Sequence, residues 1–256
     1  MLLVIDIGNT SLMLGIFEGE DLSYSCQMNT RLDQSVDEYA LLFRNFFKLK
    51  NISQDQVSGI VISSVVPPLD AVFELLSNRV FGVQPIFIDA AQQDLMPVLY
   101  SPPTDVGADR IVTGVAAFRI TQGPTIVVDF GTATTFDAIS AKGEYLGGNI
   151  VPGIGILSEV LNRRTAKLPR VEIKKPSKII GNSTVRSIQA GIYFGYLGLV
   201  KEILQGMKRE LGDCQVVATG GQASIIVRDC SDIDRLEENL ILQGLNIFYS
   251  HLKLNK

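Results

Sequence analysis

The sequence predicts an α/β protein made of two like domains, and three observations lead to this class. Apolar runs of strand length alternate with segments of helical spacing along the whole chain. The early segment VIDIGNTSLMLGI aligns with VVDFGTATTFDAI in the second half, which places Asp6 opposite Asp129. The 256 residues, 46% of them hydrophobic, suffice for two compact cores. We therefore expect one domain over 1–121 and a second over 122–256, separated at the TQGP break.

The first half is expected to begin with strands and to continue with helices that alternate with strands. Alternating or continuous apolar residues predict strands over 2–7, 12–17, 22–28, 57–66 and 85–89. Helical spacing predicts helices over 36–49 and 67–80. Pro67 and Pro68 open the second of these helices, where proline costs little because first-turn N–H groups have no helical partner.

The second half repeats this order after a helix expected over 109–120. Strands are expected over 125–129, 133–139, 145–150 and 214–218. Helices are expected over 154–168 and 183–211, with terminal helices after Gly221.

The composition excludes several classes of partner and site. The formal net charge of -4 gives no broad basic surface for nucleic acid. No apolar run approaches the roughly 20 residues that span a bilayer, and no signal-peptide pattern precedes Asp6, so we expect neither membrane association nor export. Cys26, Cys214 and Cys230 are odd in number and lack CxxC spacing, which argues against disulfides and zinc and indicates a cytoplasmic protein.

Two Asp-x-Gly turns between strands predict a site for phosphate groups. Gly8 and Gly131 let an anion approach the backbone N–H groups at each bend. A third glycine turn, at Gly220 and Gly221, follows a strand in VVATGGQA. A single such turn is typical of an ordinary hairpin whose aspartate caps its own backbone, and the repetition of the turn is what favours phosphate binding. Since neither GxxxxGK[ST] nor GxGxxG occurs, the three turns indicate a nucleotide-dependent phosphotransferase of another architecture.

Six motifs in order carry a family resemblance: DIGNT, GADR at 107–110, DFGTATT, GGNIVPGI at 147–154, TAKLP at 165–169 and GNSTVRSIQAG at 181–191. Together they resemble the type III pantothenate kinases. The resemblance implies the acetate and sugar kinase/Hsp70/actin superfamily fold, in which two tandem ribonuclease H-like domains have mixed central sheets flanked by helices. It also implies a homodimeric enzyme that phosphorylates pantothenate with ATP to 4'-phosphopantothenate, the first step of coenzyme A biosynthesis.

The resemblance assigns roles to residues around GADR. Asp109 matches the catalytic base, which accepts the proton of the pantothenate hydroxyl. The implied substrate-binding residues are Tyr100, Gly107, Ala108, Asp109, Arg110 and Thr184. The residues taken alone leave other roles open: Asp109 as a helix cap, Arg110 in a surface ion pair, and Tyr100 as an ordinary half-buried aromatic.

The resemblance also assigns the nucleotide and its ions. The implied ATP-binding residues are Asp6, Ile7, Gly8, Asn9, Thr10, Ser11 and Thr132. Asp129 matches the ligand of a monovalent cation, K⁺ or NH₄⁺, although a simple hydrogen-bonded turn fits the sequence as well. Asp6 is expected to place Mg²⁺ through water. No lysine or arginine closely follows DIGNT, so backbone amides and metal are expected to neutralise the phosphates.

Two other functions are compatible with parts of this pattern. One is a catalytically inactive accessory or regulatory protein of the same fold, but such a protein has no chemical need for the base Asp109. The other is a superfamily kinase for a sugar or small acid, which would share the Asp-x-Gly turns but not Tyr100 with GADR and Thr184.

Overall fold

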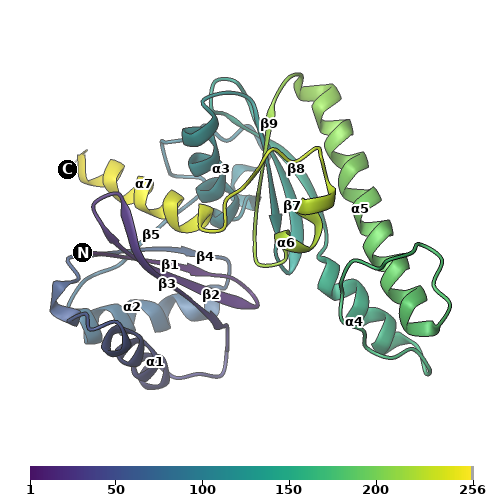
Figure 1. The fold of residues 1–256 in the computed structure, drawn as a ribbon. Coiled ribbons are helices and arrows are strands. Elements are labelled where there is room, and N and C mark those ends of the chain that lie inside the picture. Colours follow the sequence, from purple (N-terminus) through teal and green to yellow (C-terminus); the bar gives the residue numbers. More distant parts are fainter. Residues whose placement is uncertain (255–256) are drawn as a thin grey trace. The chain divides into compact units, whose positions relative to one another are not determined.

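The structure is a computed structural model that describes residues 1–254, and this part of the chain forms two compact units (Figure 1). The first unit comprises Met1–Ala116 together with the segment from Leu240 onward, and the second comprises Ala117–Asn239. This division differs from the one expected from the sequence, because the C-terminal helix belongs to the first unit. The boundary between the two units also lies at Ala116 and Ala117, within the helix Ala108–Thr121, rather than at TQGP.

The first unit is built on a mixed sheet in the order β3-β2-β1-β4-β5, in which β1 is antiparallel to β2 and parallel to β4. Its strands are β1 Leu2–Ile7, β2 Ser11–Glu18, β3 Asp21–Asn29, β4 Gly59–Ser64 and β5 Ile86–Phe87. Its helices are α1 Val36–Leu49, α2 Pro67–Phe81 and α7 Leu240–Leu254, with 3-10 turns η1 Gln54–Gln56 and η2 Pro103–Asp105. Helix α3, Ala108–Thr121, begins in this unit and continues into the second.

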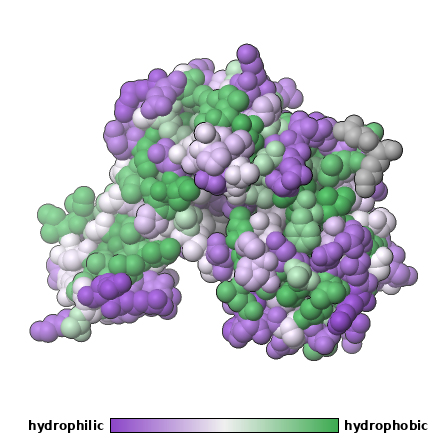
Figure 2. All heavy atoms as spheres, turned by 180° about the vertical axis from the view of Figure 1, so that it is seen from behind, coloured by the Kyte–Doolittle hydropathy of each residue, from purple (hydrophilic) through white to green (hydrophobic). Residues whose placement is uncertain are grey.

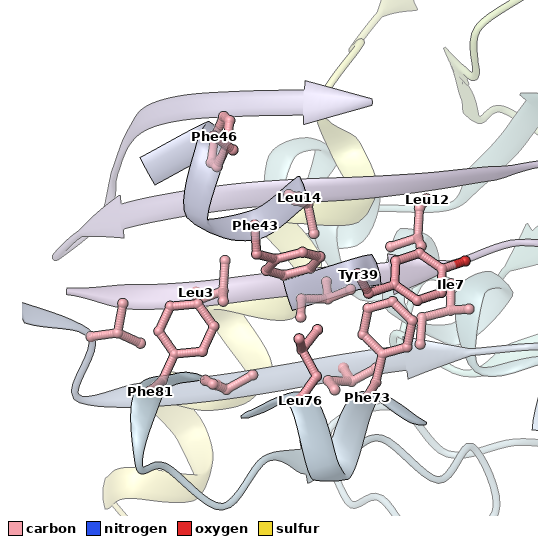
Figure 3. Close-up of a cluster of buried hydrophobic side chains, with 14 of the residues drawn as sticks. Leu3, Ile7, Leu12, Leu14, Tyr39, Phe43, Phe46, Phe73, Leu76 and Phe81 are labelled. Atoms are coloured by element: carbon pink, nitrogen blue, oxygen red, sulfur yellow. The ribbon is translucent and has the colours of Figure 1, made fainter. Parts of the chain in front are cut away.

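Both faces of this sheet are covered. Alternate residues of β1 pack with aromatic side chains of α1 and α2, as Leu3, Tyr39 and Phe73 show in Figure 3. The opposite face packs against α7, where Leu242 Cδ1 lies 3.1 Å from the position that a Cβ atom on Gly15 would take. A strand buried on both faces is apolar at successive positions, which explains the continuous run LLVI.

The capping box explains where α1 begins. The Ser35 hydroxyl accepts a hydrogen bond from the Glu38 N–H, and the Glu38 carboxylate accepts one from the Ser35 N–H at 2.7 Å. These reciprocal bonds satisfy N–H groups that have no partner inside the helix. The predicted range 36–49 is confirmed.

The second unit repeats the first. Its sheet has the order β10-β9-β6-β7-β8, and β6 is antiparallel to β7 and parallel to β9, just as β1 is to β2 and β4. Its strands are β6 Thr125–Phe130, β7 Ala133–Ile139, β8 Tyr145–Pro152, β9 Gln215–Thr219 and β10 Arg235–Leu236. Its helical elements are α4 Ile154–Arg164, α5 Thr184–Leu211, α6 Ala223–Ile226 and the 3-10 turn η3 Val227–Asp229. The predicted internal repeat and α/β class are confirmed.

The main departures from the predicted elements lie in the second half of the chain. Helix α4 ends at Arg164 rather than near position 168, the helix after Gly221 is a single turn, and the strand β10 was not predicted. None of the helices within residues 1–254 is long and apolar enough to cross a membrane.

Candidate active site

The first Asp-x-Gly turn joins β1 to β2. The Gly8 N–H donates to the Ser11 carbonyl oxygen at 3.0 Å, and the Thr30 hydroxyl donates to the Gly8 carbonyl oxygen at 2.6 Å. A Cβ atom on Gly8 would lie 2.9 Å from the Ser11 oxygen, so the turn requires glycine. Asn9 and Thr10 are exposed at the tip, where a ligand has access to them.

Asp6 is half-buried just before this turn and has the local chemistry of a magnesium ligand. In the sheet it pairs with Ser63 of β4, whose Oγ is buried and has no hydrogen-bond partner among the described residues. Within residues 1–254, no group of three or more His, Cys, Asp or Glu side chains is arranged to hold a metal. Because Mg²⁺ often uses one or two carboxylates with water and substrate phosphates, a single carboxylate at this position fits it.

Ile7 and Ser11 lie on either side of the exposed tip of the turn and are less exposed than the tip residues. The Ile7 side chain is fully buried in the core, so any contact from Ile7 to a ligand is through its backbone. Ser11 is half-buried as the first residue of β2.

The GADR motif begins helix α3. The Asp109 carboxylate accepts a hydrogen bond from the Arg110 N–H at 2.8 Å, and the Thr113 hydroxyl donates to the Asp109 carbonyl oxygen at 2.9 Å. A Cβ atom on Gly107 would overlap the Asp109 carboxylate, so glycine is needed for the carboxylate to fold back over the turn. Ala108, the first residue of α3, is buried. The sequence motif therefore fixes the direction of the Asp109 side chain.

The structure brings GADR to the sheet end that carries the first turn. The Val65 N–H donates to the Ile7 carbonyl oxygen at 3.0 Å, and Val65 Cγ1 lies 3.3 Å from the Cβ position of Gly107. Thus Asp109 lies by the carboxyl ends of the neighbouring parallel strands β1 and β4, close to the turn that follows Asp6. In open α/β sheets this is the edge at which ligands bind.

Arg110 and Tyr100 differ in burial. Arg110 is only 8% exposed, which contradicts a surface ion pair for this side chain. Tyr100 is half-buried in the irregular segment before η2.

The second Asp-x-Gly turn joins β6 to β7. Asp129 is half-buried and pairs with Thr135 on β7 and with Thr219 on β9. The Gly131 N–H donates to the Ala133 carbonyl oxygen at 3.1 Å, two residues on, whereas the Gly8 N–H bonds to the residue three positions on. The side chain of Thr132 is exposed at the tip, as an ATP contact requires.

Two further segments close on this second turn. The Gly153 N–H donates to the Thr132 carbonyl oxygen at 2.9 Å, and the Gln222 N–H donates to the Phe130 carbonyl oxygen at 3.1 Å. The Gln222 side chain also accepts from the Gly155 N–H at 3.2 Å. The three glycine-containing segments of the second unit therefore meet, and neither Gly153 nor Gln222 is among the site residues expected from the sequence.

Thr184 is the first residue of α5 and does not belong to the three segments that meet at the second turn. It is exposed, and Ser183 before it caps the helix by accepting a hydrogen bond from the Arg186 N–H. The predicted substrate residues are thus divided between the units, with Thr184 in the second and Tyr100 and Asp109 in the first.

Solved structures share this architecture. A putative Baf family transcriptional activator from Campylobacter jejuni is 19% identical with a TM-score of 0.62, covering 98% of this chain and 99% of that one. MreB 5 of Spiroplasma citri, solved with AMPPNP, is 12% identical with a TM-score of 0.56. The match covers 99% of this chain and 97% of that one. At these identities the similarity shows the fold alone, and it confirms the predicted actin-like architecture.

Sequence relatives are much closer. The type III pantothenate kinase of Koribacter versatilis is 48% identical, over 100% of this chain and 97% of its own length. The type III pantothenate kinase of Geobacter sulfurreducens is 49% identical, over 97% of this chain and 98% of its own length. The family described as "Type III pantothenate kinase" matches residues 2–206. The chain therefore belongs to the type III pantothenate kinase family.

Proposed function

We propose that the chain catalyses ATP-dependent phosphorylation of pantothenate to 4'-phosphopantothenate, the first step of coenzyme A biosynthesis. Membership of the type III pantothenate kinase family supports the substrate and the reaction. The observation that carries the chemical assignment is the position of Asp109 at the sheet end where the first Asp-x-Gly turn lies. A panel of hydroxyl acceptors tests the substrate, and equal turnover of a sugar would contradict it.

Asp109 acts as the general base in this proposal. Phosphoryl transfer depends mainly on positioning and on charge stabilisation, with a group that receives the proton of the attacking hydroxyl. The hydrogen bond from the Arg110 N–H orients the carboxylate before substrate arrives. The Arg110 guanidinium orients the anionic substrate. Tyr100 and Thr184 are the further residues that we assign to pantothenate.

Each Asp-x-Gly turn is suited, within its own unit, to bind phosphate groups of ATP. Residues 6–11 of the first turn and Thr132 of the second contribute backbone amides and hydroxyl groups, which suit phosphate oxygens. Asp6 would hold Mg²⁺. When bound, Mg²⁺ neutralises phosphate charge, a role for which DIGNT supplies no cationic side chain.

Asp129 holds a monovalent cation in this proposal. Its half-buried carboxylate lies against the backbone at Gly220, and a carboxylate oxygen is a ligand that suits a hard cation. We expect K⁺ or NH₄⁺ to activate turnover relative to Na⁺ at equal ionic strength, measured at saturating Mg²⁺ and ATP. Equal rates in the three salts would contradict a cation role for Asp129.

The protein acts as a homodimer, and the surface around the start of α5 supports this proposal. Ile179 and Ile180 are 68% and 83% exposed, and Val185 is 44% exposed one residue after Thr184. Figure 2 shows hydrophobic surface over the part of the second unit that contains α4 and the start of α5, at the lower left of the view. Exposed apolar residues grouped in this way are typical of a protein interface. A partner at this surface would cover Thr184.

Ile180→Asp is expected to convert the dimer to a monomer and to weaken pantothenate binding, because a charge in an apolar interface loses its water. Leu41→Asp, at a residue that is 61% exposed on α1, is the matched control and should leave the mass unchanged. Light scattering after gel filtration measures both. A dimeric Ile180→Asp, or a wild-type monomer, would contradict this interface.

We place the enzyme in the cytoplasm. Its three cysteines are all free thiols, which suits a reducing compartment.

A further inference from the structure

Tyr196 of α5 reaches the second Asp-x-Gly turn from inside the core. Its side chain is 2% exposed, and its hydroxyl lies 2.6 Å from Thr134 Oγ1 and 3.2 Å from the Pro152 carbonyl oxygen. Thr134 is equally buried, at 1% exposed. The side chains around them are apolar, so the Tyr196 hydroxyl forms a local polar link within the hydrophobic core.

The link to Thr134 fixes the strand that leaves the turn. Thr134 is the second residue of β7, directly after Ala133, and the Ala133 carbonyl oxygen accepts from the Gly131 N–H. A buried hydrogen bond at Thr134 therefore restrains the chain one residue beyond the bond that closes the turn.

The link to Pro152 fixes the strand end that packs on the turn. Pro152 pairs with Ala133, and the next residue, Gly153, donates to the Thr132 carbonyl oxygen. The fit is tight, since a Cβ atom on Gly153 would lie 3.0 Å from the Thr132 carbonyl carbon. A small shift of Pro152 therefore changes the position of Thr132.

We propose that Tyr196 is a positioning residue for the nucleotide: its hydroxyl holds Thr134 and Pro152 and so fixes the turn that presents Thr132 to the ATP phosphates. This inference rests on the proposed function, which assigns Thr132 to ATP. The ring of Tyr196 fills the core whether or not it carries oxygen, so the hydroxyl is the group whose removal tests the role. Burial raises the pKa of Tyr196, which keeps the hydroxyl protonated at neutral pH.

The test is Tyr196→Phe, with Tyr193→Phe as the matched control. Tyr193 lies one helical turn earlier, is 1% exposed, and donates a hydrogen bond to Asp229 rather than to a residue of the turn. We expect Tyr196→Phe to raise the dissociation constant for ATP about 5-fold or more, as the loss of one buried hydrogen bond implies. The KM for pantothenate should stay within about twofold. Tyr193→Phe should leave ATP affinity unchanged.

Thr134 provides a second pair of variants. Thr134→Val keeps the shape but lacks the hydroxyl, and should weaken ATP binding as Tyr196→Phe does. Thr134→Ser keeps the hydroxyl and should retain wild-type affinity. Because Tyr196→Phe already removes the bond to Thr134, the double variant Tyr196→Phe/Thr134→Val should bind ATP about as well as Tyr196→Phe alone.

Calorimetric titration with ATP distinguishes the outcomes. Wild-type affinity in Tyr196→Phe, or an equal loss in Tyr193→Phe, would overturn the positioning role and leave the proposed function intact. A wild-type chain that binds ATP without phosphorylating pantothenate would contradict the proposed function, and the same titrations would still decide on Tyr196. A wild-type chain that binds no ATP would overturn both.

Discussion

Asp109→Asn is expected to lower turnover by about 100-fold or more while leaving ATP affinity nearly unchanged, because an amide cannot take the proton of the attacking hydroxyl. The substitution preserves size, and the amide oxygen can still accept the hydrogen bond from the Arg110 N–H. Loss of one charge at the start of α3 costs about 0.3–1 kcal/mol, too little to unfold a typical domain. Steady-state kinetics and calorimetric titration with ATP measure the two quantities.

Asp105→Asn is the matched control for this prediction. Asp105 is exposed in η2, four residues before Asp109, and the same chemical change there should leave turnover at the wild-type level. Turnover of Asp109→Asn near that of the wild type would remove Asp109 from the role of base. A similar decrease in both variants would indicate a general effect of charge.

Gly220→Ala is expected to destabilise the second unit strongly. Gly220 has a φ of +94°, and an added Cβ atom would lie 2.7 Å from the backbone nitrogen and carbonyl carbon of Phe130 and would overlap the Asp129 carboxylate. Backbone strain and overpacking together predict a loss of roughly 2–4 kcal/mol in the free energy of unfolding. Because Asp129 must move, we also expect turnover to fall by about 100-fold.

The neighbouring glycine provides the control. Gly221 is exposed, and no heavy atom lies within 4 Å of its Cβ position, so Gly221→Ala should change the free energy of unfolding by less than about 0.5 kcal/mol. Urea unfolding and kcat of the two variants measure the difference. Equal effects at the two positions would show that crowding around Asp129 is not the cause.

The sequence predicts those parts of the fold that depend on local signals. The limits of β1 are confirmed because the apolar run begins after Met1 and ends at the glycine turn. The start of α1 follows from a capping box within four residues. The repeat of Asp6 in Asp129 predicts two like sheets, since each aspartate is the last residue but one of the central strand of its sheet and a glycine follows that strand.

Contacts between distant segments were beyond sequence reasoning. The apolar residues of α7 indicate burial but not the sheet against which they pack, so α7 was placed in the second domain although it contacts β1 and β4. The strand β10 has only two residues, both exposed, and gives no apolar signal. The contacts of Gly153 and Gln222 with the second turn join segments far apart in the chain, so no local pattern predicts them.

The most direct test of the central claim is a coupled assay of the wild-type chain with ATP, pantothenate, Mg²⁺ and K⁺, with the product identified by mass spectrometry. The account predicts ADP formation that depends on pantothenate, together with 4'-phosphopantothenate in equal amount. A folded, dimeric chain that forms no such product would contradict it and favour an accessory protein of the same fold.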